Sequence, residues 1–289
     1  METLKVAFVD FWPEIEHENI FLPILEKHFD VQVTRINPDI VIHSIFGRMQ
    51  ETPKYKCKKI LFLGENWRPE QFGSDYSISF DPHTDKNFRL PLWQFYLLLR
   101  PELQTLVFDK KPKHEKFDRF CSFTVSNPGN FMRNSFFGQL SQQGPGKVFS
   151  YGRYMTNDLS LQKESQGTYW RDAKYNFFKN NRHKYSIAFE NNSYPYYCTE
   201  KLMDAFLAGS IPLYWGDPKI KEDWNSDAFI NVGKIGADPT IKNIRDMETN
   251  DSLFYKIYNE PIFTEEQKTK HINNITNFEK WFIEIIKNK

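Results

Sequence analysis

The sequence has few cysteines and no pattern typical of a disulfide scaffold. Only three of its 289 residues are cysteine, and these (Cys57, Cys121 and Cys198) are widely spaced. Secreted domains that depend on disulfides carry more cysteines, usually in even numbers. The first residues, METLKVAFVDF, also lack the basic segment and apolar run of a secretory signal peptide. We therefore expect a cytoplasmic protein.

A large excess of one charge and a long apolar run are lacking too. Lys and Arg number 38 and Asp and Glu 37, a formal net charge of +1. No broad positive field is therefore available to hold nucleic acid or an anionic membrane. The longest apolar stretch, Leu90 to Leu99, contains Gln94 and has about half the length that a membrane-spanning helix needs. We expect no nucleic-acid partner and at most peripheral contact with the inner face of a membrane.

Several motifs of cofactor and metal chemistry are missing. No G-x-G-x-x-G follows the first predicted strand, which argues against a nicotinamide cofactor. The segment Gly144-Pro145-Gly146-Lys147 lacks the spacing of a Walker A loop, and no G-x-S-x-G or H-E-x-x-H pattern occurs. No Asp-x-Asp pair is present to clamp a divalent metal on a nucleotide sugar. We expect that the protein requires neither a metal nor another cofactor.

Short apolar runs alternate with segments of helical period along most of the chain. The first set has predicted strands at 4–8, 31–36, 39–45, 59–63 and 76–80, and a predicted helix at 20–29. The second set has predicted strands at 120–125, 147–151, 185–189, 211–215 and 228–232, and predicted helices at 130–142 and 199–208. A charged segment with Pro112, from Lys110 to Lys116, predicts a hinge between the sets. Two such sets are typical of two open α/β domains with largely parallel sheets, whose ligands bind beyond the carboxyl ends of the strands.

The C-terminal residues carry one apolar stripe at helical spacing. Its members are Ile275, Phe278, Trp281, Phe282, Ile285 and Ile286. The opposite face has mixed charge rather than a basic excess, so the pattern favours packing of an amphipathic helix onto the core over membrane attachment.

The richest segment for chemistry is YSIAFENNSYPYYCTEKLMDAFLAGSIPLYWGD, residues 185–217. Thr199 has the side chain of an N-cap, and Gly209 is a natural helix stop. The start of a helix at the end of a strand offers free N–H groups to an anion, and Lys201 would strengthen such a site for a diphosphate. Glu200 would then accept hydrogen bonds from a ribose. The alternative is a capped surface helix with a solvated Glu200–Lys201 pair.

Three stretches together resemble a known enzyme family. F-E-N, Y-x-T-E-K and I-P-L-Y-W-G, within residues 185–217, resemble the donor-binding signature of the α-1,3/1,4-fucosyltransferases, glycosyltransferase family ten. Val125-Ser126-Asn127-Pro128 with Arg133-Asn134 resembles the start of the family's donor domain. Leu63-Gly64-Glu65-Asn66, followed by the segment 75–81, resembles the segment with its catalytic carboxylate. The matches run from about residue 60 to 232. The heptad repeats and basic tail of some bacterial members are not seen, nor are the signal anchor and disulfides of animal members, so a bacterial type fits better.

The resemblance implies a GT-B arrangement, two Rossmann-like domains facing a cleft, with GDP-β-L-fucose as the donor. Residues 1–115 would form the acceptor-side domain, residues 116–265 the GDP-sugar-binding domain, and residues 266–289 the amphipathic helix. Carried over by position, Glu65 would be the general base. Donor binding would fall to the following residues: Arg133 and Lys201 on the diphosphate, Glu200 on the ribose, and Asn127, Asn191 and Tyr197 lining the site.

These roles agree with the chemistry of an inverting transfer. Such a reaction needs a base for the acceptor hydroxyl and cations on the departing diphosphate, and fixed cations can replace a metal there. We expect an oligosaccharide acceptor, an N-acetylglucosamine hydroxyl of a LacNAc-type glycan, with α-1,3 favoured over α-1,4 linkage. Two alternatives stay open: a transferase of the same fold that uses another GDP-sugar, and a catalytically silent glycan- or nucleotide-binding module.

Overall fold

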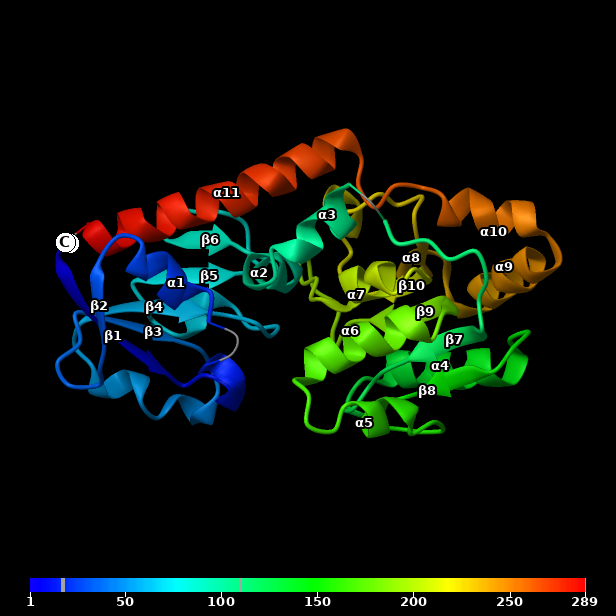
Figure 1. Ribbon diagram of the computed structural model, residues 1–289, viewed down its shortest axis with the longest axis horizontal. Helices are drawn as coiled ribbons and strands as arrows, with labels where there is room; N and C mark the ends of the chain where they lie inside the picture. The colour runs from blue at the N-terminus through cyan, green and yellow to red at the C-terminus, as the bar shows by residue number, and fades with distance from the viewer. Residues whose placement is uncertain (17–18, 110, 289) are drawn as a thin grey trace. The chain divides into compact units, whose positions relative to one another are not determined.

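The computed structural model describes residues 1–16, 19–109 and 111–288, which fold into two units (Figure 1). Unit 1 comprises residues 1–101 and 269–289, and unit 2 comprises residues 102–268. The sequence placed the boundaries after residues 115 and 265, so the structure divides the chain at other positions. The predicted hinge begins at Lys110, which lies outside the described residues. The next residue, Lys111, donates from Nζ to the carbonyl oxygens of Tyr258 (3.0 Å) and Glu260 (3.2 Å), and this ties the segment to unit 2.

Unit 1 is built on a six-stranded parallel sheet of order β2-β1-β3-β4-β5-β6. All four residues of β3 are buried, as expected for a strand covered on both faces. The strands are β1 (Thr3–Val9), β2 (Asp30–Val33), β3 (Ile40–His43), β4 (Lys58–Phe62), β5 (Tyr76–Ser79) and β6 (Asn87–Arg89), and the α-helices are α1 (Phe21–Glu26), α2 (Leu92–Leu99) and most of α11 (Glu265–Lys287). Short 3₁₀ helices lie at Pro13–Glu16, Gly47–Met49, Thr52–Lys54 and Pro69–Gln71.

The long C-terminal helix α11 packs its apolar stripe on the core of unit 1, as the sequence predicts. The Phe278 ring lies 5.3 Å from that of Phe88 on β6, beside which α11 runs in Figure 1. The Phe282 ring lies 5.5 Å from that of Phe21 on α1, and both rings are fully buried. Among the described residues, no helix combines the length and the apolar character that crossing a membrane requires.

Unit 2 is built on a five-stranded parallel sheet of order β11-β10-β9-β7-β8. The strands are β7 (Arg119–Phe123), β8 (Val148–Ser150), β9 (His183–Phe189), β10 (Ile211–Trp215) and β11 (Ile230–Asn231). The helices are α3 (Glu102–Phe108), α4 (Phe131–Gln143), α5 (Ser160–Glu164), α6 (Trp170–Asn180), α7 (Lys201–Leu207), α8 (Val232–Ile235), α9 (Ala237–Thr249) and α10 (Asp251–Tyr258), with a 3₁₀ turn at Ile220–Glu222. The predicted α/β class is confirmed for both units.

Aromatic stacking fixes α4 on the sheet of unit 2. The Phe137 ring stacks on Phe123 of β7 at 4.5 Å, and the Phe136 ring stacks on Phe189 of β9 at 4.9 Å. These four rings are buried, and each buried side chain of this size contributes about 1.5–3 kcal/mol. The packing places the N-terminus of α4 at the edge where β7 and β9 end.

Candidate active site

The carboxyl end of β9 leads into a loop that is tied to the end of β10. Glu190 extends the ladder between these strands, because its N–H donates to the Trp215 carbonyl at 2.8 Å. The Ser193 hydroxyl donates to the Gly216 carbonyl at 2.7 Å. Tyr196, which has a left-handed φ of +68°, donates its N–H to Asp217 Oδ1 at 2.7 Å. These bonds set the path of the chain toward α7.

The prediction that Thr199 caps the next helix is wrong. The N-cap position of α7 is Glu200, which makes no side-chain cap bond, and the helix begins at Lys201. The Thr199 hydroxyl instead donates to Glu190 Oε2 at 2.6 Å, and the Thr199 N–H donates to Glu190 Oε1 at 2.7 Å. A buried carboxylate needs hydrogen-bond donors more strongly than a helix terminus does. The predicted stop at Gly209 is confirmed: its φ is +66° and its N–H donates to the Phe206 carbonyl.

Lys201 lies among three side-chain oxygens at the start of α7. Its Nζ is 2.9 Å from Thr199 Oγ1, 3.4 Å from Glu190 Oε2 and 3.5 Å from Glu200 Oε1. The side chain keeps 22% of its surface exposed, so the ammonium is held by its neighbours and still reachable by a ligand. The alternative of a freely solvated Glu200–Lys201 pair does not describe this arrangement.

Glu200 is ionised by the cations around it. Burial alone raises the pKa of its carboxyl, but Lys201, Arg171 and Lys174 outweigh this and lower the pKa to about 2. Glu200 is therefore an acceptor of hydrogen bonds at neutral pH, as a ligand to sugar hydroxyls must be.

Two of these cations, Arg171 and Lys174, were not singled out from the sequence. Both belong to α6 and both bind Asp204 of α7, at 3.2 Å and 2.7 Å. They come from a polar and aromatic stretch, and only the packing of α6 against α7 brings them to Glu200. In the sequence, only their spacing of three residues, which places both on one face of a helix, could have marked them as a pair of cations.

Arg133 contacts two of the other predicted site residues, Asn127 and Asn191. Its guanidinium donates to Asn191 Oδ1 at 2.7 Å and to the Asn127 carbonyl at 2.5 Å. Asn130 caps α4 by accepting from the Arg133 N–H at 2.8 Å, and its amide donates to the Asn191 carbonyl at 2.9 Å. The loops that follow β7 and β9 are thus joined through one buried arginine, which is only 2% exposed.

Arg133 interacts electrostatically with Glu190, which also lies beside Lys201. Burial lowers the pKa of its guanidinium, and the negative charge of Glu190 opposes this change. Within the described residues, Arg133 Nε is buried and has no hydrogen-bond partner.

Tyr197, predicted to line the donor site, is fully buried. Its ring therefore supports the loop from inside.

Glu65 lies at the carboxyl end of a strand in unit 1, as predicted. It is half-buried and follows β4 after Leu63 and Gly64, and its carbonyl accepts from the Trp67 N–H at 2.8 Å. Three residues further along the chain, the Arg68 guanidinium binds both Asn66 and Asp81. Burial raises the pKa of the Asp81 carboxyl despite this ion pair. The pair fixes the segment after Glu65 to the end of β5.

Other polar groups share this edge of the unit 1 sheet. His43 ends β3 and its Nε2 lies 2.7 Å from Ser74 Oγ. Burial lowers the pKa of this imidazole, which is therefore neutral at neutral pH. Asp10 follows β1 and accepts from the Thr52 N–H and hydroxyl at 2.8 Å and 2.6 Å. Polar side chains thus follow β1, β3, β4 and β5 at the carboxyl edge of this sheet.

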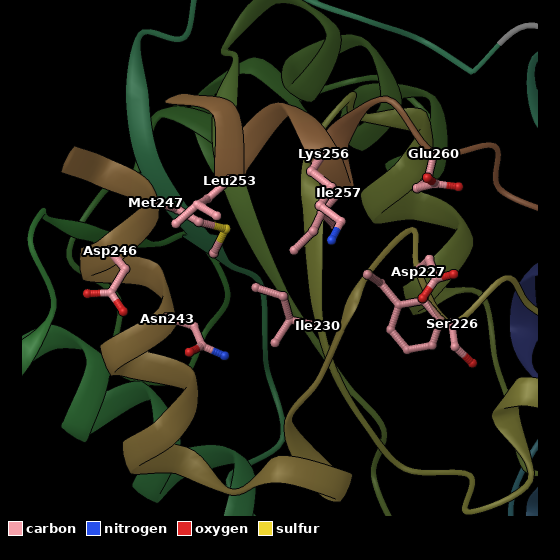
Figure 2. Close-up of a pocket in the computed structure, with 11 residues that line it drawn as sticks. Ser226, Asp227, Ile230, Asn243, Asp246, Met247, Leu253, Lys256, Ile257 and Glu260 are labelled. Carbon is pink, nitrogen blue, oxygen red and sulfur yellow. The ribbon is translucent and has the colours of Figure 1, made fainter. Parts of the chain in front are cut away.

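A pocket of unit 2, with a volume of about 480 Å³, lies away from these residues. It borders the residues that precede β11 and the helices α9 and α10, and so lies beside the amino end of β11, whereas the predicted site residues of unit 2 follow the carboxyl ends of β7 and β9. Figure 2 shows the apolar side chains of Ile230, Met247, Leu253 and Ile257 converging on it. None of the predicted site residues lines it. Within the described residues, no group of three or more His, Cys, Asp or Glu is placed to hold a metal ion.

The chain matches two sequence models of one enzyme family. Residues 6–96 match the Alpha-(1,3)-fucosyltransferase FucT N-terminal domain. Residues 113–277 match the C-terminal model of Glycosyltransferase family 10 (fucosyltransferase). The second match alone covers more than half of the chain.

Curated relatives of the chain are also named as fucosyltransferases. The chain is 26% identical to Alpha-(1,3)-fucosyltransferase FucT of Helicobacter pylori over 94% of its own length, but it spans 63% of that protein. It is 28% identical to 4-galactosyl-N-acetylglucosaminide 3-alpha-L-fucosyltransferase 9 of Mus musculus over 34% of this chain and 33% of the relative.

Solved structures support the fold. A crystal structure of an alpha1,3-fucosyltransferase aligns with a TM-score of 0.71 at 22% identity, covering 96% of this chain and 90% of that one. A crystal structure of alpha1,3-fucosyltransferase with GDP-fucose aligns with a TM-score of 0.70 at 23% identity, covering 100% and 92%. The likeness confirms the predicted GT-B type of fold. The chain belongs to glycosyltransferase family 10, the fucosyltransferases.

Proposed function

We propose that this protein is an inverting α-1,3-fucosyltransferase. It would move L-fucose from GDP-β-L-fucose to an N-acetylglucosamine hydroxyl of a LacNAc-type glycan. Membership of family 10 supports the reaction class. The name of the H. pylori relative supports the linkage, and the solved relative with GDP-fucose supports the donor.

One observation in unit 2 carries the donor half of the proposal. Two cations, Arg133 and Lys201, are held by short contacts beside the ends of β7 and β9, and an ionised Glu200 lies next to the second. Two cations suit a diphosphate, and a carboxylate that only accepts suits the two hydroxyls of a ribose. Asn127 and Asn191 fix the position of Arg133 and would border the bound nucleotide.

Glu65 of unit 1 would act as the general base. As the acceptor oxygen bonds to C1 of fucose, Glu65 takes the proton of that hydroxyl, and the bond from C1 to the diphosphate breaks. The electron pair leaves with GDP, whose growing charge Arg133 and Lys201 stabilise. Attack on the face opposite the leaving group inverts the configuration at C1.

We propose that no metal takes part, because the two cations supply positive charge where a metal would otherwise sit. Turnover of GDP-fucose should therefore be unchanged in excess chelator. Abolition of turnover by chelator, with recovery on adding Mn²⁺ or Mg²⁺, would contradict this.

We also propose a cytoplasmic location with at most peripheral membrane contact, supported by the free thiols of Cys57, Cys121 and Cys198.

The proposal is tested by incubating the protein with GDP-fucose and a panel of type 1 and type 2 disaccharides. We expect fucose on the 3-hydroxyl of N-acetylglucosamine in the type 2 acceptor, identified by linkage analysis of the product. Transfer from GDP-mannose but not from GDP-fucose would assign another donor. Binding of GDP without any transfer would indicate a silent nucleotide-binding module.

A further inference from the structure

Glu190 is a buried acid at the centre of the donor-side residues, to which neither the sequence analysis nor the proposed function gives a role. Its side chain is fully buried at the end of β9. A buried carboxylate is costly unless donors and a counter-charge surround it. Glu190 has both: one oxygen accepts the Thr199 N–H, the other accepts the Thr199 hydroxyl, and Lys201 Nζ lies 3.4 Å from Oε2. Burial raises the pKa of the carboxyl, and Lys201 and the Thr199 donors oppose this change.

The same carboxylate faces Lys201 across one hydroxyl group. Glu190 Oε2 lies 2.6 Å from Thr199 Oγ1 and 3.4 Å from Lys201 Nζ, and Thr199 Oγ1 lies 2.9 Å from Lys201 Nζ. The Glu190 carboxylate, the Thr199 hydroxyl and the Lys201 ammonium therefore form a triangle of mutual contacts. It spans the loop between the end of β9 and the start of α7, two elements in direct contact (Figure 1).

The backbone of the neighbouring strand closes over Glu190. A side chain at Gly216, just after β10, would place its Cβ 2.5 Å from Glu190 Cγ and 2.9 Å from the Tyr214 hydroxyl. Such distances are too short for any Cβ, so only glycine allows this approach. Glu190 is thus held from the strand side as well as from the loop side.

We propose that Glu190 is a positioning residue: acting through Thr199, it fixes the ammonium of Lys201 toward the anionic part of the donor. It touches no substrate itself. This inference rests on the proposed function, since it needs a nucleoside diphosphate that Lys201 binds.

The direction in which one substitution changes the affinity for GDP separates this role from a purely electrostatic effect of the Glu190 charge. Glu190→Gln keeps the shape of the side chain and removes its negative charge. If Glu190 acted only through its field, its removal would strengthen binding of an anion. If it positions Lys201, binding weakens because the ammonium loses its anchor. We expect the Kd of GDP, measured by calorimetry, to rise about tenfold, the value of one hydrogen bond to a charged group.

A control with the same kinds of partner lies on α9, beside the opposite end of β9; its side chain is 26% exposed, whereas that of Glu190 is 0% exposed. Glu248 also pairs with a lysine and a hydroxyl, since it lies 2.8 Å from Lys184 Nζ and 2.9 Å from the Tyr185 hydroxyl. Glu248→Gln therefore makes the same chemical change at the start of β9 and should leave the Kd of GDP unchanged. Equal weakening by both substitutions would assign the effect to general loosening of unit 2 and overturn the inference.

A double variant tests whether Glu190 acts through Lys201. Lys201→Met alone should weaken GDP more than Glu190→Gln does, and the double variant should bind GDP as Lys201→Met does. Multiplied effects, or a GDP affinity of Glu190→Gln equal to or tighter than that of the wild type, would overturn the inference. If wild-type protein does not bind GDP, the proposed function and this inference fail together.

Thr199 offers a second route should Glu190→Gln not fold. Thr199→Val removes the bridging hydroxyl and should weaken GDP about as much, whereas Thr199→Ser keeps the hydroxyl and should restore wild-type affinity. Equal affinities of Thr199→Val and Thr199→Ser would contradict the inference.

Discussion

At the scale of the residue, Glu65 carries the most specific chemical prediction. Glu65→Gln keeps the size of the side chain but cannot accept the proton of the acceptor hydroxyl. We expect kcat for fucosyl transfer to fall by roughly 10²- to 10⁴-fold, the usual contribution of a general base. The Kd of GDP should stay at the wild-type value, because Arg133 and Lys201 belong to the other unit. A variant that keeps most of its rate would remove Glu65 from the role of base.

Lys201 carries the matching prediction for the donor side. Lys201→Ala removes the ammonium that lies beside Thr199 and Glu200. We expect the affinity for GDP to fall at least tenfold while that for guanosine changes little, because guanosine has no phosphate. Equilibrium titration with both ligands measures the difference. Equal loss for the two ligands would mean that Lys201 does not bind phosphate.

Individual site residues could be predicted only where a motif marked them. The Y-x-T-E-K pattern pointed to Glu200 and Lys201, and the structure places them together. Glu190 belongs to the F-E-N motif, but one sequence does not show that a strand-end acid is buried against Thr199. Arg171 and Lys174 reach Glu200 through helix packing, which leaves no local trace in the sequence.

At the scale of the element, strand cores were easier to predict than helix starts. The predicted strand at 211–215 coincides with β10. The helix predicted at 199–208 begins two residues later, because the Thr199 hydroxyl binds Glu190 rather than the helix terminus. The helix predicted at 20–29 covers only Phe21–Glu26, and Asn19 Oδ1 accepts from its first N–H groups. Apolar periodicity locates elements, whereas their ends depend on distant hydrogen-bond partners.

The central strands of unit 2 share a hydrogen-bonded chain with a pH-dependent consequence. Arg119 of β7 donates to the Tyr151 hydroxyl. That hydroxyl lies 2.9 Å from His183 Nε2, and His183 Nδ1 lies 2.7 Å from the Asn181 carbonyl. The imidazole is buried. Burial lowers its pKa from 6.5 to about 4, with Arg119 adding to the effect.

This shift makes unit 2 less stable in mild acid. Between pH 6.5 and 4 the unfolded chain binds a proton on His183 that the folded chain does not, so the free energy of unfolding falls as the pH falls. The full loss is about 3 kcal/mol, at about 1.4 kcal/mol for each pH unit. Urea unfolding at several pH values measures it. His183→Gln should be less stable at pH 7 but should lose less stability on going to pH 4. An equal slope for both proteins would contradict the assignment to His183.

At the scale of the whole molecule, the predicted fold type is correct but the chain is divided differently. The sequence treated residues 266–289 as a separate helix, whereas residues 269–289 belong to unit 1 together with the first strands. Periodicity showed the apolar stripe of this helix. It could not show that Phe282 meets Phe21, because that contact joins residues far apart in the sequence.

Because residues 269–289 belong to unit 1, we expect that a substitution there can lower the stability of unit 1 without changing nucleotide binding by unit 2. Phe282 is fully buried in unit 1, so Phe282→Ala should destabilise that unit by about 3–5 kcal/mol through lost burial and a cavity. GDP binds residues of unit 2 in the proposed function, so its Kd should not change at temperatures where the variant is folded. Thermal unfolding followed with and without GDP measures both quantities. The exposed face of the same helix provides the control: Lys280→Ala should alter neither. Loss of GDP affinity in Phe282→Ala would mean that donor binding depends on the integrity of unit 1, because no donor-binding residue proposed here lies in that unit.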